Sequence, residues 1–145
     1  MGLYRFRYAG DLGGDANIDG HLIYIPPSDL RKVWDVVKSG LMEVRKHTDE
    51  PWIPEDIYTE LKNGTATLHI EKDGGGFVVL QKTPQYDGVA LHIWAAYSEG
   101  LEPLETYIAE IEQMARNIGA KRLTLSSKRN WRKYFEPVIY KKELL

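Results

Sequence analysis

Three oxygen-bearing side chains stand at alternating positions in a short segment near the start of the chain. Asp15, Asn17 and Asp19 are followed by Gly20, and this spacing matches positions 1, 3, 5 and 6 of a calcium-binding loop. The match ends at position 12, where Pro26 replaces the expected bidentate glutamate. Asp and Asn also favour turns, because their side chains hydrogen-bond to nearby backbone. The segment therefore predicts either a weak calcium or magnesium site or a turn.

A second cluster combines an aromatic ring with cationic side chains. Trp131 lies among four cations, which are Lys128, Arg129, Arg132 and Lys133. Residues 121–145 hold eight Lys and Arg against two Asp and Glu, whereas residues 1–120 hold 11 against 19. Such a tryptophan can stack on a nucleic-acid base while the cations contact phosphates. Alternatively, the basic end neutralises an acidic body, and Trp131 serves a protein interface.

Several classes of chemistry are excluded by composition. The 145-residue chain contains no cysteine, which rules out disulfide scaffolds, thiolate nucleophiles, zinc fingers and iron–sulfur clusters. Its length predicts one domain, and 43% hydrophobic with 28% charged residues is typical of a globular protein. No apolar run reaches the roughly 20 residues of a membrane span. No basic-then-apolar leader opens the chain, so secretion through a signal peptide is not expected.

Hydrophobic periodicity distributes these residues over a series of strands and helices. Alternating or continuous apolar patterns predict strands at residues 3–8, 21–25, 65–71, 77–83, 89–97, 123–125 and 138–145. Helical spacing predicts helices at residues 28–44, 54–63, 104–118 and 130–135. Ser28 is expected to cap the first helix, and Gly64 and Gly119 follow the ends of two others. The nearly continuous apolar strand at 89–97 is expected to be central and buried on both faces.

The order of these elements predicts the fold class. The strand at 89–97, the helix at 104–118 and the strand at 123–125 form a parallel crossover. The three strands between residues 65 and 97 are joined by short turns and are therefore antiparallel. We expect an α/β (α+β) domain with a mixed, mostly antiparallel sheet of about six to seven strands and about four helices. Residues 21–145 form this domain.

Residues 1–20 form a separate N-terminal arm, a strand followed by a Gly- and Asp-rich loop. The strand alternates Tyr4, Phe6 and Tyr8 with basic residues. It either extends the protein's own sheet or adds to the sheet of a partner. The predicted partner-binding residues are Tyr4, Phe6, Tyr8 and Trp131.

Two segments of the sequence, and one combination of residues, resemble those of a known protein family. PSDLRKVW at residues 27–34 and GAKRLTL at residues 119–125 resemble two segments of the GNAT superfamily of N-acetyltransferases, the entry to the first helix and the step after the cofactor helix. Asp56, residues 64–68 and residues 129–131 together resemble the divergent GNAT-like proteins of tailed bacteriophages. The resemblance spans about residues 21–145. It implies a GNAT-like fold and, for a phage-encoded protein, a location in the host cytoplasm or the virion.

The resemblance also locates a cofactor turn. In GNAT enzymes, a turn with the pattern Gln/Arg-x-x-Gly-x-Gly/Ala follows the central strand, and its backbone amides hold the pyrophosphate of acetyl-CoA. The implied cofactor contacts here are Tyr97, Ser98, Gly100 and Leu101. This turn also contains Glu99, Glu102 and Pro103, of which the last has no amide hydrogen. Two like charges about 5 Å apart repel by about 3 kcal/mol at an effective dielectric of about 20, so the turn is expected to disfavour the cofactor.

Catalytic positions follow from the same resemblance. The family often uses a tyrosine after the last helix as proton donor, and Tyr134 is the nearest candidate. Its general base is often a glutamate, or a water held by the antiparallel strands, which points to Glu71 and His92. Alternatively, Tyr134 is a core aromatic residue and His92 is a surface or hydrogen-bonded polar residue.

Three hypotheses on function remain. The first is a cofactor-deficient GNAT-like protein that acts in phage assembly or in the virion, binding other subunits or itself through residues 1–20. The alternative is a divergent acetyl-CoA-dependent N-acetyltransferase, whose central strand separates from its neighbour after about Tyr97 to open a cofactor cleft. The third is a nucleic-acid-binding accessory protein that uses the basic cluster. No membrane partner is expected, and acetyl-CoA is the cofactor only under the second hypothesis.

Overall fold

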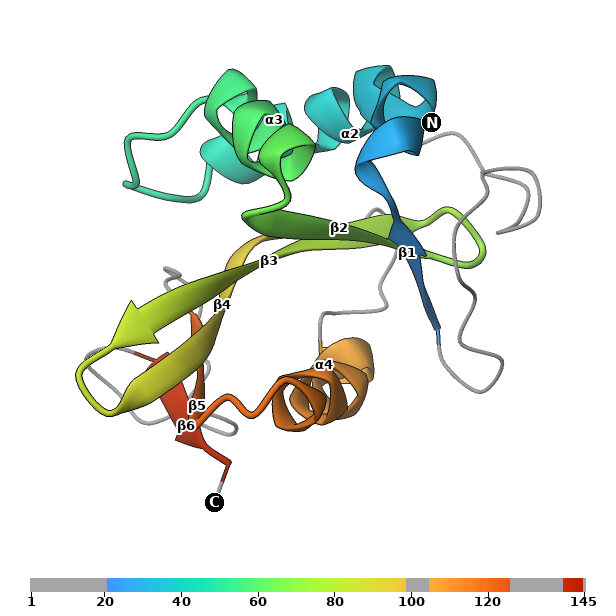
Figure 1. The fold of residues 1–145 in the computed structure, drawn as a ribbon. Coiled ribbons are helices and arrows are strands. Elements are labelled where there is room, and N and C mark those ends of the chain that lie inside the picture. Colours follow the sequence, from blue (N-terminus) through green and yellow to red (C-terminus); the bar gives the residue numbers. More distant parts are fainter. Residues whose placement is uncertain (1–20, 99–104, 126–139, 145) are drawn as a thin grey trace.

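A computed structural model describes residues 21–98, 105–125 and 140–144. Within them, six strands form one sheet in sequence order, with three α-helices and a short 3-10 turn (Figure 1). The strands are β1 (Leu22–Ile25), β2 (Ala66–Glu71), β3 (Gly76–Gln85), β4 (Gly88–Ser98), β5 (Arg122–Leu125) and β6 (Tyr140–Glu143). The helices are η1 (Pro27–Asp29), α2 (Leu30–Arg45), α3 (Pro54–Asn63) and α4 (Glu105–Asn117). The strand predicted at 3–8 and the helix predicted at 130–135 lie outside the described residues.

The sheet is mixed and mostly antiparallel, which confirms the predicted fold class. The strands β1 to β4 are antiparallel neighbours, β5 pairs in parallel with β4, and β6 is antiparallel to β5. The crossover from β4 to β5 passes through α4. Figure 1 shows α2 and α3 on one face of the sheet and α4 on the other.

Two hydrophobic cores form because successive side chains of a strand point to opposite faces. The first core lies under α2 and α3 and includes Phe77 and Val79 of β3. The second core lies under α4 and includes the intervening Val78 and Leu80. The strand β4 also contributes to both cores, which confirms the prediction that it is buried on both faces.

The start of α2 differs from the prediction that Ser28 caps it. The chain first makes the 3-10 turn, in which the Asp29 amide donates to the Pro26 carbonyl at 2.9 Å. The helix begins at Leu30, and no side chain caps its first turn. The Ser28 prediction was wrong because a 3-10 turn occupies the position expected for the helix start. Asp29 is buried and pairs with Lys32 at 3.1 Å.

Gly40 brings α2 close to the end of β4. A Cβ atom at this position would lie 2.5 Å from Cε2 of Phe77 and 3.1 Å from Cδ2 of Tyr97. These two aromatic rings are stacked, with centroids 5.6 Å apart. The missing side chain of Gly40 therefore allows the helix to pack directly on the rings that lie at the end of the central strand.

Candidate functional site

The strand β4 contains a β-bulge in its middle. Val79 of β3 pairs with Ala95, but the next residue, Leu80, pairs with Ile93, so Trp94 is an extra residue in β4. Trp94 and Ala95 consequently both pack on the first core, whereas Ile93 packs on the second. A bulge of this kind bends a strand and redirects its side chains, and bulges are frequent next to functional sites.

The described pairing between β4 and β5 reaches the residue before this bulge. It runs from Ala90 opposite Arg122 to Ile93 opposite Leu125, and β4 then continues to Ser98. Among the strands that the structure describes, none pairs with residues 94–96 on the β5 side.

His92 lies one residue before the last paired position. Its neighbours Leu91 and Ile93 pack on the second core, so the His92 side chain lies on the sheet face opposite α4. Its Nδ1 atom is 2.7 Å from Oγ1 of Thr124 on β5. Burial lowers the pKa of the His92 imidazole below its ordinary value. The ring is therefore neutral at neutral pH and can accept a proton.

His92 belongs to a row of polar side chains that crosses three strands and reaches α3. Gln81 is its partner in the register on β3, and Thr124 is its partner on β5. Nε2 of Gln81 donates to Oε1 of Glu60 on α3 at 3.4 Å, and the same oxygen accepts from Oγ1 of Thr65 at 2.7 Å. We call Glu60, Gln81, His92 and Thr124 the polar row. It places hydrogen-bonding side chains on the strands that flank His92, next to the bulge.

Glu71, the other strand residue proposed as a base, lies on the opposite face of the sheet. Leu68 and Ile70 of β2 pack on the first core, so Glu71 points to the α4 side. Its Oε2 atom accepts the Gly75 amide at 3.0 Å and thereby supports the turn between β2 and β3. The structure therefore does not bring Glu71 and His92 together.

The remaining predicted site residues divide into two groups. Tyr97 stacks on Phe77, and Ser98 pairs with Gly76, so both lie at the end of β4. The others lie outside the described residues: Gly100, Leu101 and Tyr134; Asp15, Asn17 and Asp19; Tyr4, Phe6, Tyr8 and Trp131; Lys128, Arg129, Arg132 and Lys133. Within residues 21–98, 105–125 and 140–144, no three His, Cys, Asp or Glu side chains gather as a metal site. No described helix has the length and apolar character needed to cross a membrane.

Sequence analysis did not identify Thr124 or Glu60 as site residues. Thr124 stands between two leucines of the second core, which places it on the same face as His92. This alternation and the parallel pairing of β4 with β5 could be predicted from the sequence, but the register that makes the two residues neighbours could not. Glu60 lies in the last turns of α3, where a solvent-facing glutamate is unremarkable in sequence.

A second buried histidine, His69 on β2, has a different environment. Its side chain lies on the α4 face and is 8% exposed, with its ring 5.6 Å from the Tyr24 ring. Nε2 lies 2.9 Å from Oγ1 of Thr67, and the buried Nδ1 atom has no hydrogen-bond partner among the described residues. Burial lowers the pKa of His69 to about 4. This ring is neutral at neutral pH and more deeply buried than His92.

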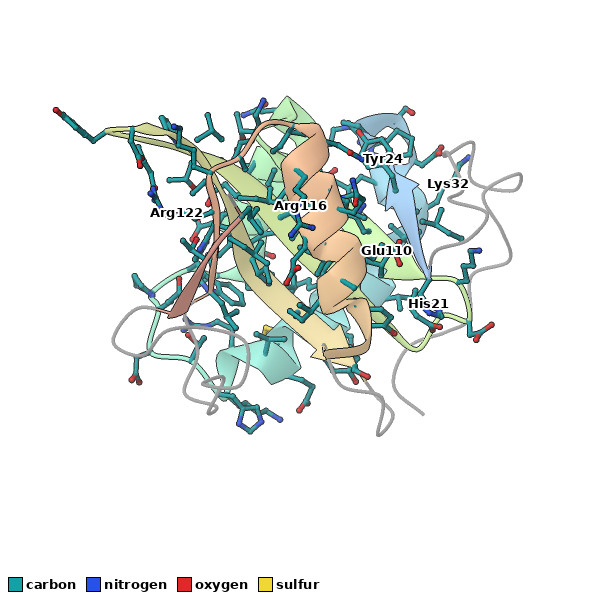
Figure 2. All side chains as sticks on the ribbon, turned by 90° about the horizontal axis from the view of Figure 1, so that it is seen from below. His21, Tyr24, Lys32, Glu110, Arg116 and Arg122 are labelled. Atoms are coloured by element: carbon teal, nitrogen blue, oxygen red, sulfur yellow. The ribbon has the colours of Figure 1, made fainter. Side chains whose placement is uncertain are left out.

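Two polar contacts link strands of the sheet to other parts of the domain. Glu110 on α4 accepts the backbone amides of His21 and Leu22 at 2.7 and 3.1 Å, which attaches β1 to the helix (Figure 2). Arg122 on β5 forms a bidentate ion pair with Asp87 in the turn between β3 and β4, at 2.9 and 2.6 Å. This guanidinium lowers the pKa of Asp87 to about 2. The first contact holds β1 against α4, and the second joins β5 to the turn between β3 and β4.

Comparisons with known proteins identify the fold. No protein-family profile matches the chain, and no curated protein sequence matches it. Solved structures do match. A GNAT-family acetyltransferase from Listeria monocytogenes has a TM-score of 0.60 and 14% identity, covering 90% of this chain and 99% of its own.

Two further solved structures agree with this match. A ribosomal-protein-alanine N-acetyltransferase from Brucella melitensis has a TM-score of 0.54 and 15% identity, covering 77% of this chain and 82% of its own. A GNAT-family acetyltransferase from Staphylococcus aureus has a TM-score of 0.55 and 18% identity, covering 81% and 94%. At such low identity the likeness concerns the fold alone. The chain therefore has a divergent form of the GNAT acetyltransferase fold.

Proposed function

We propose that this protein is an acyl-CoA-dependent N-acyltransferase in which His92 accepts the proton of the amine. The observation on which the proposal rests is the position of a neutral, half-buried His92 beside the β4 bulge, with its Nδ1 atom held by Thr124 of β5. The similarity of the fold to that of acetyltransferases is consistent with this activity, but a fold by itself does not establish a function.

The reaction requires a proton acceptor near the strand that would hold the thioester. The amine nitrogen forms a bond to the acyl carbon, the carbon–sulfur bond breaks, and CoA leaves as a thiol. The amine's proton passes to the neutral imidazole of His92, directly or through one water molecule. A proton is then needed by the departing sulfur, a role that the family resemblance implies for Tyr134.

The backbone of β4 fits part of an acyl-CoA. We propose that the backbone of residues 94–96, which continues β4 past the described pairing with β5, hydrogen-bonds to the extended, amide-carrying arm of the acyl-CoA. The bulge at Trp94 changes which backbone groups point toward this edge. Bound acyl-CoA would supply the activated acyl group. The charges of Glu99 and Glu102 oppose its pyrophosphate, so we expect affinity weaker than a Gly-rich turn would provide.

Calorimetric titration with acetyl-CoA tests binding directly. A dissociation constant below about 100 µM, roughly −5.5 kcal/mol, supports the proposal, whereas no heat up to millimolar ligand refutes it. A panel of primary amines then tests turnover by release of free CoA thiol. His92→Gln should bind acetyl-CoA normally and lose turnover. His47→Gln, which replaces an exposed histidine of the same chain, is the matched control and should retain activity.

A second candidate function is supported by the acidic turn. Glu99, Glu102 and Pro103 favour a protein that keeps the fold without the cofactor and binds other subunits. Absence of acetyl-CoA binding, together with self-association or capture of a defined partner that is lost on deleting residues 1–20, would support it. The phage or virion setting stays a prediction from resemblance. Nucleic-acid binding also stays a prediction, to be tested by salt-dependent DNA affinity.

A further inference from the structure

The contact between His92 and Thr124 results from the pairing of β4 with β5. Thr124 lies directly opposite His92 in the parallel register, between the pairs Leu91–Leu123 and Ile93–Leu125. Both flanking pairs are buried in the second core, so the backbone holds the two side chains together. Within the described part of the chain, the Thr124 hydroxyl is the hydrogen-bond partner of the imidazole, at 2.7 Å from Nδ1.

The direction of this hydrogen bond decides whether His92 can act as a base. A neutral imidazole has one N–H, and a threonine hydroxyl can either donate or accept. If Thr124 donates to Nδ1, then Nε2 carries the ring proton and cannot take another. If Thr124 accepts from the Nδ1–H, then Nε2 has a free electron pair. Proton uptake at Nε2 then leaves the Thr124 contact intact.

The proposed role of His92 requires the second arrangement. Nδ1 lies 2.7 Å from Oγ1 of Thr124, so the hydroxyl occupies this nitrogen. Nε2 is not a buried atom without a partner, so it is the ring nitrogen that an amine or a water molecule can reach. Because a neutral imidazole carries a single ring proton, Nε2 can take up a proton only if that single proton lies on Nδ1 and is donated to Thr124.

We infer that Thr124 is a positioning residue for acyl transfer: its Oγ1 accepts the Nδ1–H of His92 and keeps Nε2 as the basic atom. The inference rests on the proposed function, because a base is needed only if the amine is acylated. The tautomer itself is a property of the folded chain and can be measured without substrate.

Long-range proton–nitrogen NMR of the full chain, labelled with ¹⁵N in its four histidines, reads the tautomer directly. Replacing each histidine by glutamine in turn assigns the signals. We expect the Nδ1–H form for His92 in the wild-type protein, retention of that form in Thr124→Ser, and a change to the Nε2–H form in Thr124→Val.

The chain offers a matched control on the other face of the sheet. Thr67 contacts Nε2 of His69 at 2.9 Å, as Thr124 contacts Nδ1 of His92. Thr67→Val removes the same kind of hydroxyl from β2, which β3 separates from β4, and should leave the His92 signals unchanged. In turnover, Thr124→Val should lower kcat at least about tenfold with KM for acetyl-CoA within about twofold, and Thr124→Ser should restore it.

The outcomes separate the inference from the proposed function. An Nε2–H form of His92 in the wild-type protein overturns the inference, and this spectrum needs no variant that must fold. A tautomer that is unchanged in folded Thr124→Val also overturns it. The Nδ1–H form together with loss of that form in Thr124→Val supports the positioning contact. If such a protein then turns over no amine, the proposed function fails while the assignment of the contact stands.

Discussion

Acidification should destabilise this protein through His69. The pKa of this imidazole in the folded chain is about 4, against about 6.5 for an unperturbed histidine, because burial disfavours the charged ring. At pH 7 the ring is neutral in both the folded and the unfolded chain. As the pH falls below about 6.5, the unfolded chain takes up a proton that the folded chain does not, so the free energy of unfolding decreases.

The magnitude follows from the two pKa values. A difference of about 2.5 units corresponds to about 3 kcal/mol, reached once the pH has fallen to about 4. Between pH 7 and pH 5 the loss is about 2 kcal/mol. This is a large fraction of the 5–15 kcal/mol by which a typical domain is stable. Within the described part of the chain, the Nδ1 atom has no acceptor that could stabilise the extra proton, so no hydrogen bond offsets the lowering of the pKa by burial.

Urea unfolding at pH 7 and pH 5, followed by tryptophan fluorescence, measures this loss. The informative variant is His69→Gln, which keeps a polar group within reach of Thr67 and cannot titrate. Its free energy of unfolding should fall by about 2 kcal/mol less over this pH range than that of the wild-type protein. The difference isolates His69, because the lowered pKa of His92 contributes equally to both proteins. Equal pH dependence in the two proteins would refute the reasoning.

Three other perturbations test the packing around the site. Gly40→Ala should lower the free energy of unfolding by about 1–3 kcal/mol, since the new methyl group would meet the Phe77 ring at 2.5 Å; unchanged urea stability would contradict this packing. Gly64→Ala should cost about 1–2 kcal/mol from its φ of 79° alone, and Gly64→Asn should cost less, as thermal unfolding can show. Arg122→Lys should raise the pKa of Asp87 from about 2 toward its usual value, and a carboxyl NMR titration that finds no rise would count against the bidentate pair.

The local pattern of apolar residues was sufficient to predict the helices and strands of this fold. The apolar spacing of α2, α3 and α4 predicted each helix within a few residues, because one face of each helix must be buried whatever it packs against. The Asn63–Gly64 pair predicted where α3 ends, since glycine adopts the left-handed conformation without steric cost. The strand–helix–strand order predicted the parallel pairing of β4 and β5, because a crossover of that length permits little else.

The site depended on contacts that no local pattern encodes. His92 and Thr124 are 32 residues apart, and only the register between β4 and β5 makes them neighbours. The bulge at Trp94 reverses the alternation within β4, which an unbroken apolar run does not reveal. Glu71 and His92 both looked suitable as bases, and the sheet places them on opposite faces.

The sequence alone therefore determined which segments form strands and helices and in what order they connect, because these follow from backbone propensity and the period of burial. Only the tertiary structure decided which polar side chains meet, because strand register and bulges are set by the packing of both cores together. The candidate base was visible in the sequence, whereas the hydroxyl that orients it was found only in the folded chain.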